Sequence, residues 1–273
     1  MGDIRIRDLT SYEEFEKVVH IQKIVWKHKN VDLTPAHQFT ISIKTGAILL
    51  GAFVRDELVG FVYSFPAVVY GNLAQHSHQL AVLPRFRGKN IGKMLKWSQR
   101  RKALKMGYEI LTWTSDPLLA RNANMNLHTL GAEVRTYLQD FYTGIPALSV
   151  GRGIPVDRFL MEWHINKKKV DKRRRRGFDK IKEEAFPLVL DGAWRHECFL
   201  QKNPRLGLEG GHLLAEIPRN IPDTSKTTEE IMEWQKAVRR VMKHYFAKGY
   251  RAVDFIYKER CYYVLQRTRN KEE

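Results

Sequence analysis

The segment from Gln75 to Gly107 joins three successive patterns and constrains the fold more than any other part of the chain. Residues 75–83 are expected to form a β-strand that ends in the apolar stretch Leu80–Leu83, residues 84–92 form a basic loop with two glycines, and residues 91–104 have helical apolar spacing. A strand that passes through a glycine-containing loop into a helix is a building unit of α/β sheets. We therefore expect the α/β class: a mixed sheet with helices on both of its faces.

Strand and helix patterns alternate over the first 165 residues. Ile4–Ile6 predicts a strand, and Ser11 with Glu14 has the spacing of a capping box at the start of a helix. Thr34-Pro35 predicts the start of a second helix, which ends near Gly46. The remaining strands are predicted at residues 47–54, 58–69, 75–83, 108–113, 133–138 and 158–165, and a helix is predicted at residues 117–130.

A strongly basic run divides the chain. Between Lys167 and Arg176 eight residues are basic and one is acidic. Because like charges oppose tight packing, the run predicts a linker at residues 166–177 between a domain at 1–165 and a smaller α+β domain at 178–273. In the second domain we expect a helix at residues 228–248 and strands at residues 187–190, 212–217, 252–257 and 262–266. Its helix and final strand pair also suggest a degenerate half-copy of the first domain.

Composition narrows the class of protein. The net charge of +17 favours anionic partners, such as nucleic acid or a small phosphorylated molecule. The two cysteines, Cys198 and Cys261, lack the spacing of a metal site or redox pair, so no metal is expected. No apolar run approaches the roughly 20 residues of a membrane span, and the first residues do not resemble a secretory signal. We expect a cytoplasmic protein without a membrane partner.

The loop at residues 87–92 carries a known motif. Its sequence, Arg-Gly-Lys-Asn-Ile-Gly, resembles the acyl-CoA signature of the GNAT superfamily of N-acetyltransferases, Arg/Gln-x-x-Gly-x-Gly/Ala. Arg87 and Gly92 match the signature, whereas Asn90 replaces its middle glycine; Asn tolerates a positive φ better than other non-glycine residues do. The resemblance implies a GNAT-type acyltransferase fold and a coenzyme A thioester as co-substrate.

The physical chemistry of the loop agrees with this resemblance. A helix that begins near Ile91 presents unpaired N–H groups and the positive end of its dipole to a diphosphate. Glycines allow a close approach, nearby cations add attraction, and by resemblance the end of the strand lends backbone groups to the pantetheine arm. The predicted cofactor-binding residues are Leu80, Val82, Arg87, Gly88, Lys89, Asn90, Ile91, Gly92 and Lys93. The alternative is a simple strand-to-helix turn with basic residues.

The resemblance continues to about residue 164, because Ala123, Leu130 and Gly131-Ala132 match the next helix of the family. Many members place a tyrosine there as general acid, but this chain has Leu127. Tyr142, or Tyr137, is a candidate replacement.

Acyl transfer to an amine also needs a base. His78 is the first candidate, because two-residue alternation places it on one strand face with His76, Leu80 and Val82. Asp116, at the end of the next strand, is either catalytic or a helix N-cap. Asn122 and Asn126, four residues apart, are expected to share a helix face that binds the acceptor or the thioester oxygen, or a face that is solvated.

Several stretches, among them Ser77–Val82, Trp113–Leu118 and Gly249–Phe255, resemble a bacterial GNAT subgroup whose genes often neighbour N-succinylamino-acid racemases. For some members this implies succinyl-CoA as donor and a free amino acid as acceptor. We predict an N-acyltransferase that moves an acetyl or succinyl group from acetyl-CoA or succinyl-CoA to a small amine or amino acid. The alternatives are a non-catalytic acyl-CoA-binding protein or a nucleic-acid-binding protein, the latter disfavoured because no aromatic residue interrupts the basic run. A homodimer is left open.

Overall fold

The structure is a computed structural model that describes residues 3–26, 32–142, 156–176, 186–195, 198–221 and 227–268. The chain divides into two compact units: the first comprises residues 1–113 and 164–166, and the second comprises residues 114–163 and 167–273. This grouping differs from the expected domains at 1–165 and 178–273, because residues 114–163 join the C-terminal part of the chain.

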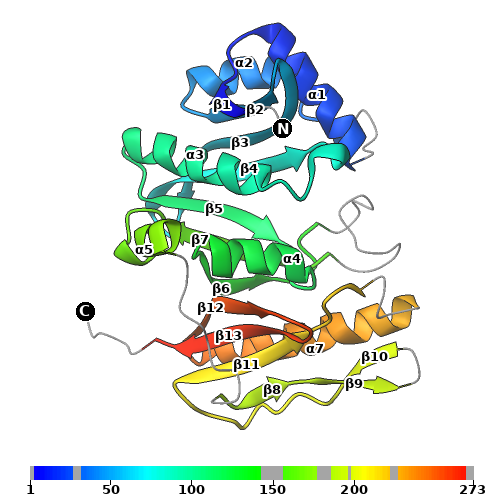
Figure 1. Ribbon diagram of the computed structural model, residues 1–273. Coiled ribbons are helices and arrows are strands. Elements are labelled where there is room, and N and C mark those ends of the chain that lie inside the picture. Colours follow the sequence, from blue (N-terminus) through cyan, green and yellow to red (C-terminus); the bar gives the residue numbers. More distant parts are fainter. Residues whose placement is uncertain are drawn as a thin grey trace. The chain divides into compact units, whose positions relative to one another are not determined.

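The first unit is a sheet with strand order β1-β2-β3-β4-β5 (Figure 1). Its strands are β1 (Ile4–Asp8), β2 (Ile48–Val54), β3 (Glu57–Val69), β4 (Asn72–Val82) and β5 (Ile110–Ser115). The first four are antiparallel neighbours, and β5 runs parallel to β4. Three helices belong to this unit: α1 (Tyr12–Trp26), α2 (Ala36–Lys44) and α3 (Ile91–Lys105).

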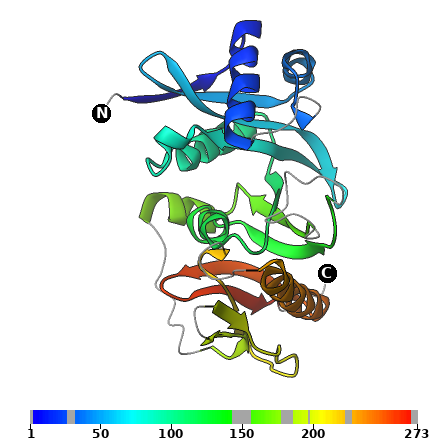
Figure 2. The same ribbon diagram turned by 90° about the vertical axis from the view of Figure 1, so that its right-hand side faces the viewer.

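The two faces of this sheet carry different helices (Figures 1 and 2). Phe15 of α1 and Phe39 of α2 belong to one apolar core together with Phe61 of β3 and Ala81 of β4. Helix α3 covers the opposite face, where its Gln99 donates to the Ser77 hydroxyl of β4 at 3.1 Å. The predicted arrangement of helices on both faces of a mixed sheet is thereby confirmed for this unit.

Local sequence signals explain where the first helices begin. The predicted capping box is present, since the Ser11 hydroxyl accepts from the backbone of Glu14 and the Glu14 carboxylate accepts from the backbone of Ser11, both at 3.2 Å. Helix α2 starts at Ala36 with Pro35 as its N-cap, one residue later than predicted. Thr34 accepts a hydrogen bond from the Gln79 side chain at 3.1 Å instead of capping the helix.

The second unit contains a sheet with strand order β7-β6-β12-β13-β11-β8. Its strands are β6 (Glu133–Leu138), β7 (Arg158–His164), β8 (Leu188–Leu190), β11 (His212–Ile217), β12 (Tyr250–Tyr257) and β13 (Cys261–Arg267). Neighbours are antiparallel except β8 and β11. Strands β9 (Gly192–Arg195) and β10 (Cys198–Gln201) form a separate hairpin that the sequence patterns did not predict.

Helices also pack in the second unit. The long helix α7 (Thr228–Ala247) begins at a capping box between Thr227 and Glu230 and buries Trp234, Val238 and Val241. Two short elements, α4 (Ala120–Ala123) and the π-helix η3 (Asn124–Thr129), follow β5. Within the ranges that the structure describes, no helix is long and apolar enough to cross a membrane.

The basic run forms a helix, α5 (Lys168–Arg176), where a linker at residues 166–177 was expected. Val170 is 1% exposed, and the Arg173 guanidinium donates to the Asp254 carboxylate at 2.7 Å. Burial of one apolar residue and pairing of one arginine with an acid that is distant in sequence offset the repulsion among like charges.

Candidate functional site

The predicted cofactor-binding residues lie in the first unit, at the end of β4 and the start of α3 (Figure 1). The 3₁₀-helix η2 (Pro84–Phe86) and residues 87–90 connect these elements. Gly88 and Asn90 have φ angles of +77° and +60°, which place both in the left-handed region. Asn90, at the position of the middle glycine of the signature, therefore adopts a positive φ, which Asn tolerates better than other non-glycine residues do.

The first turn of α3 is open toward this loop. Asn90 is the N-cap and makes no side-chain capping hydrogen bond, and its carbonyl accepts the first helical bond from Met94 at 3.0 Å. The N–H groups of residues 91–93 precede that bond and lie at the positive end of the helix dipole. Arg87 and Lys93 are exposed on either side of the turn, so the loop can hold a phosphate-bearing ligand.

Two of the predicted cations have contacts within the loop itself. The Arg87 Nε donates to the Val82 carbonyl oxygen at 3.2 Å. The Lys89 Nζ lies 5.1 Å from the centre of the Phe86 ring. Leu80 and Val82 are half-buried on β4, and Ile91 is buried under the loop. Arg87 thus fixes the loop to the strand that was predicted to receive the pantetheine arm.

His78 lies at a bulge in β4. Tyr63 of β3 pairs with Gln79, and the next residue, Ser64, pairs with Ser77, so His78 is the extra residue between two paired positions. A bulge bends the strand and turns a side chain away from the regular alternation. His78, the extra residue of the bulge, is exposed.

The bulge overturns one expectation about His78. Ser77 receives a hydrogen bond from Lys96 of α3 at 3.0 Å, whereas Gln79 donates to Gln22 of α1 at 3.2 Å. Residues 77 and 79 therefore face opposite sides of the sheet although they are two positions apart. His76 and His78 still share a face, since their ring centres are 6.5 Å apart and Phe65 lies beside both. Two-residue alternation does not continue from His78 to Leu80, because the extra residue resets the pattern.

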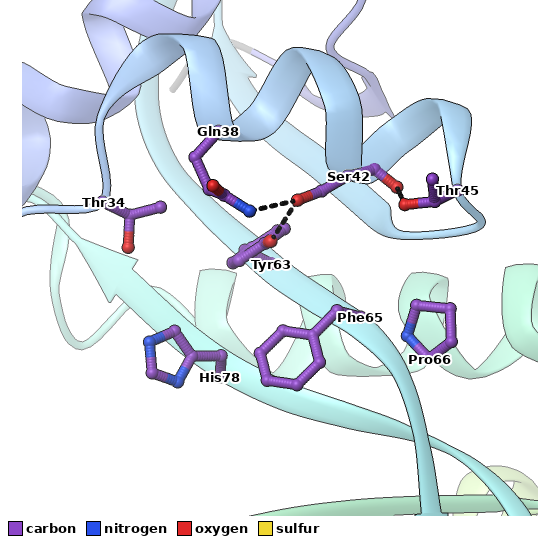
Figure 3. Close-up of a pocket in the computed structure, with 8 residues that line it drawn as sticks. All are labelled: Thr34, Gln38, Ser42, Thr45, Tyr63, Phe65, Pro66 and His78. Carbon is purple, nitrogen blue, oxygen red and sulfur yellow. Dashed lines mark hydrogen bonds between the residues drawn. The ribbon is translucent and has the colours of Figure 1, made fainter.

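A cavity of about 680 Å³ opens between α2 and strands β3 and β4, beside His78 (Figure 3). The Tyr63 hydroxyl donates to the Ser42 hydroxyl at 2.8 Å, and the Gln38 amide donates to the same oxygen at 3.2 Å. The lining residues carry hydroxyl, amide, aromatic and imidazole groups but no carboxylate, ammonium or guanidinium: Thr34, Gln38, Ser42, Thr45, Tyr63, Phe65, Pro66 and His78.

The electrostatic setting favours neutral imidazoles on β4. Aromatic neighbours crowd His78, with Phe65 at 5.7 Å and Tyr63 at 6.3 Å between ring centres, and this desolvation lowers the pKa of His78. Burial, followed by the charges of His78 and Lys96, lowers the pKa of His76 to about 4. A neutral imidazole that faces a cavity can accept a proton, so the geometry allows His78 to act as a base.

Asp116 belongs to the second unit, where β5 ends. Its Oδ1 accepts from the Leu118 backbone at 2.8 Å, and its Oδ2 lies 3.4 Å from Nη1 of Arg158. Burial raises the pKa of Asp116, against the opposing effects of the Leu118 hydrogen bond and the Arg158 charge. The helix predicted from residue 117 begins only at Ala120, so Asp116 stabilises a turn and is not a helix N-cap.

Tyr142 lies close to Thr114 and Arg158 in the second unit. Its hydroxyl is 3.3 Å from Oγ1 of Thr114, and the guanidinium of Arg158 lies 5.6 Å from its ring centre. Tyr137, the other candidate acid, donates to the Asp157 carboxylate at 2.5 Å, and burial raises its pKa well above the usual range. Tyr137 is therefore committed to a structural bond, whereas Tyr142 remains the candidate proton donor.

The two asparagines of the following helix do not share a face. Asn122 is exposed, whereas Asn126 is buried and donates to the Ser115 hydroxyl at 3.1 Å. Residues 124–129 form a π-helix, with Leu130 donating to the carbonyl of Met125, so the four-residue repeat of an α-helix fails there. The expectation of a common polar face is wrong for this reason, and only Asn126 joins the residues at the end of β5.

The structure thus gathers the predicted residues into two groups. His78 and the loop at residues 87–93 lie in the first unit; Asp116, Asn126 and Tyr142 lie in the second. Within the described parts of the chain, no group of three His, Cys, Asp or Glu residues is placed to hold a metal ion. Sequence patterns missed Arg158, which contacts both Asp116 and Tyr142, because only pairing across strands reveals an arginine of this kind.

Comparison with known proteins supports the motif assignment. Residues 11–131 match the model of the acetyltransferase (GNAT) family. No curated protein matches the chain in a sequence comparison.

Solved structures similar to this chain include several acetyltransferases. A putative acetyltransferase from Salmonella typhimurium, determined with its cofactor acetyl-CoA, has a TM-score of 0.49 and 15% identity over 61% of this chain and 96% of its own. The ribosomal-protein-S18-alanine N-acetyltransferase from Escherichia coli has a TM-score of 0.47 and 15% identity over 60% and 96%. An N-acetyltransferase from Thermoplasma acidophilum in complex with coenzyme A has a TM-score of 0.43 and 18% identity over 59% and 99%.

The family match covers the strand, loop and helix that carry the predicted acyl-CoA site. It confirms the predicted mixed α/β fold and supports the prediction of an acyltransferase. Residues 11–131 are therefore the part of the chain that is similar to the acetyltransferase (GNAT) family.

Proposed function

We propose that this protein is an acyl-CoA-dependent N-acyltransferase that transfers an acetyl or similarly small acyl group to the amine of a small molecule. One observation carries the proposal: strand β4 bears an exposed imidazole at its bulge and ends at a left-handed loop before the open first turn of α3. Proton acceptor and anion site are thus attached to the same strand. The match to the acetyltransferase (GNAT) family supports this chemistry.

In the proposed complex the anion site holds the diphosphate of coenzyme A. The N–H groups of residues 91–93 donate to phosphate oxygens, and Arg87, Lys89 and Lys93 contribute positive charge. Glycine at position 88 keeps a side chain away from the ligand. The backbone of β4 near Leu80 and Val82 lies beside the pantetheine arm.

The proposed reaction requires two proton transfers. His78 takes a proton from the ammonium form of the acceptor, and the neutral amine attacks the thioester carbonyl carbon. The tetrahedral intermediate then collapses: the carbon–sulfur bond breaks, the amide remains, and the thiolate takes a proton.

The cavity beside His78 is proposed as the acceptor site. Its eight lining residues offer hydrogen bonds and aromatic surface without a formal charge, a chemistry that suits an amine with a neutral, hydroxylated or aromatic body. A free amino acid, which the subgroup resemblance suggests, would need a cation for its carboxylate from outside these eight residues. The comparison of an amino acid with its amide therefore tests the acceptor directly.

The test uses the purified 273-residue chain with acetyl-CoA or succinyl-CoA as donor. The acceptors are a panel of amines, both enantiomers of amino acids, and the corresponding amino-acid amides. Release of free thiol that depends on the acceptor, together with a new amide detected by mass spectrometry, is the expected result. Faster reaction of the amino-acid amides than of the free amino acids would support an acceptor without a carboxylate. The absence of both coenzyme A binding in calorimetry and thiol release with every acceptor would overturn the proposal.

A further inference from the structure

Thr34, which lies just before helix α2, is held in place by two buried glutamines of the first unit. The Thr34 N–H donates to Oε1 of Gln22 at 2.9 Å, and Nε2 of the same amide donates to the Thr34 carbonyl oxygen at 3.0 Å. Nε2 of Gln79 donates to the Thr34 hydroxyl at 3.1 Å and to Oε1 of Gln22 at 3.2 Å. Gln22 is 0% exposed and Gln79 is 9% exposed, so α1 and β4 each commit a buried amide to one threonine.

These hydrogen bonds fix the direction of every group in the cluster. The backbone of Thr34 presents one donor and one acceptor, so the Gln22 amide can bind it in one orientation only, with its oxygen on the N–H. Gln79 must then turn its nitrogen toward the Gln22 oxygen, because the reverse orientation would set two oxygens against each other. The second N–H of the Gln79 amide reaches the Thr34 hydroxyl, which is therefore the acceptor in this bond.

The Thr34 hydroxyl consequently keeps its own proton for another partner. Among the residues that the structure describes, no group accepts a hydrogen bond from it. Thr34 lines the cavity beside His78, and its hydroxyl oxygen is directed to the side on which His78 lies (Figure 3). A donor that is oriented by a supporting shell of buried side chains is preorganised for a ligand.

Thr45, the other threonine of this cavity, differs from Thr34 in this respect. Its hydroxyl donates to the carbonyl oxygens of Ile41 and Ser42, both at 3.1 Å, so its proton is already engaged at the end of α2. Thr45 can therefore offer a ligand only lone pairs, whereas Thr34 offers a donor.

The ligand atom that suits the Thr34 hydroxyl is an uncharged oxygen. The hydroxyl proton needs an acceptor, and the lining carries no ammonium or guanidinium group that would neutralise a carboxylate. A hydroxyl or carbonyl oxygen meets both conditions. Gln79, which anchors the Thr34 hydroxyl, directly follows His78 on β4, so the ligand oxygen and a group that contacts the imidazole must lie close together.

We propose that Thr34 is a specificity-determining residue: its hydroxyl donates to an uncharged oxygen of the acceptor, so that the protein selects amines with a hydroxyl or carbonyl group near the reacting nitrogen. This inference rests on the proposed function, which makes the cavity beside His78 the acceptor site. All residues that carry it belong to the first unit.

The test compares two amines that differ by a single hydroxyl, phenylethylamine and phenylethanolamine. Their aromatic ring suits the Phe65 and Tyr63 side chains of the lining. NMR titration of the 273-residue chain gives the Kd of each amine, and thiol release from acetyl-CoA gives kcat/KM. In the wild type, one enantiomer of phenylethanolamine should bind about 3- to 10-fold more tightly than phenylethylamine, which is the effect of one net hydrogen bond.

Substitutions at the two threonines test which hydroxyl is responsible. Thr34→Val replaces the hydroxyl by a methyl group and should bring the ratio of the two Kd values to about one, whereas Thr34→Ser keeps the hydroxyl and the ratio. Thr45→Val is the matched control, because it makes the same change in the same cavity at a hydroxyl whose proton is engaged, and it should keep the wild-type ratio. Thr34→Ala, which leaves room for water beside Gln79, gives the same test if Thr34→Val does not fold.

The ratio separates recognition from a structural role, since a structural change would alter both Kd values by the same factor. An unchanged ratio in Thr34→Val or Thr34→Ala would overturn the inference, and so would the absence of binding of both amines to the wild type. The proposed function fails in a different way. If phenylethanolamine binds with the expected dependence on Thr34 but no acceptor releases thiol from acetyl-CoA, recognition of the oxygen stands and acyl transfer is refuted.

Discussion

The Nε atom of Arg87 donates to the carbonyl oxygen of Val82 at 3.2 Å, so the loop before α3 is fixed to the end of β4 by its own cationic residue. A guanidinium has further N–H groups in a planar fork, and one side chain can contact both a carbonyl and a phosphate. This relationship links the conformation of the loop to its affinity for an anion.

Replacement of Arg87 should weaken coenzyme A binding through both effects. We expect Arg87→Ala to raise the Kd for coenzyme A by about five- to tenfold, equivalent to about 1 kcal/mol. Arg87→Lys keeps the charge but loses the Nε donor, so its Kd for coenzyme A should lie between the values of the wild type and Arg87→Ala. Calorimetry gives the Kd values, with Lys105→Ala at the exposed opposite end of α3 as the charge-matched control. An unchanged Kd for Arg87→Ala would exclude Arg87 from the phosphate site.

Asn90 provides a test of backbone conformation. Its φ of +60° suits glycine and disfavours a residue with a Cβ and no local polar group. Asn90→Gly should keep the affinity for coenzyme A, whereas Asn90→Ala should lose about 1 kcal/mol of unfolding free energy and weaken binding. Urea denaturation and calorimetry measure the two effects. Equal stability of Asn90→Ala and the wild type would show that the turn relaxes without cost.

The sequence was most informative where structure depends on near neighbours. The capping box at Ser11 and Glu14 and the left-handed loop before α3 follow from residues within a few positions of one another, and both were predicted. The candidate phosphate site is local in the same sense. A strand, a turn and a helix N-terminus specify it without reference to the rest of the chain.

The features that were missed depend on distant partners. The bulge at His78 is defined by its register with Tyr63 and Ser64 on another strand, and no pattern within β4 indicates it. The basic run forms a helix in which the Arg173 guanidinium donates to the carboxylate of Asp254, 81 residues away in the sequence. Likewise, Arg239 and Asp157 meet across 82 residues. Charge patterns predict exposure, but pairing decides which charges are buried.

His78 gives a prediction in pH. Desolvation lowers its pKa, so its neutral form persists below the pH at which an ordinary imidazole becomes protonated. If His78 is the base, the acidic limb of kcat/KM should lie below pH ~6.5, the ordinary histidine value. His78→Gln should lower kcat by about 10²- to 10⁴-fold and remove that limb.

His76→Gln is the control for this prediction. Its imidazole lies two residues away on the same strand, with Nδ1 3.0 Å from the Thr112 hydroxyl, and its pKa of about 4 keeps it neutral near pH 7. We expect His76→Gln to keep the acidic limb. Loss of the limb in His76→Gln but not in His78→Gln would reverse the assignment of the base.

Lys96 gives a prediction about stability. Its ammonium is buried beneath β4, donates to the Ser77 hydroxyl at 3.0 Å and to the Gln99 amide at 2.7 Å, and lies 4.0 Å from the Trp113 ring centre. Burial lowers the pKa of Lys96 to about 7 from 10.5. Between these two values the unfolded chain binds more protons than the folded chain, so unfolding free energy rises with pH.

Lys96→Met removes this titration and leaves a side chain of similar length. The stability of the wild type relative to Lys96→Met should therefore increase by about 1–3 kcal/mol between pH 7 and pH 9, whatever the offset at pH 7. Below about pH 6, one unit under the pKa of the folded state, the difference should be nearly flat, because lysine is then protonated in both states. Urea denaturation across this range measures it, and exposed Lys105→Met is the control whose difference should not change. A constant difference for Lys96→Met would mean that the buried ammonium keeps its proton throughout.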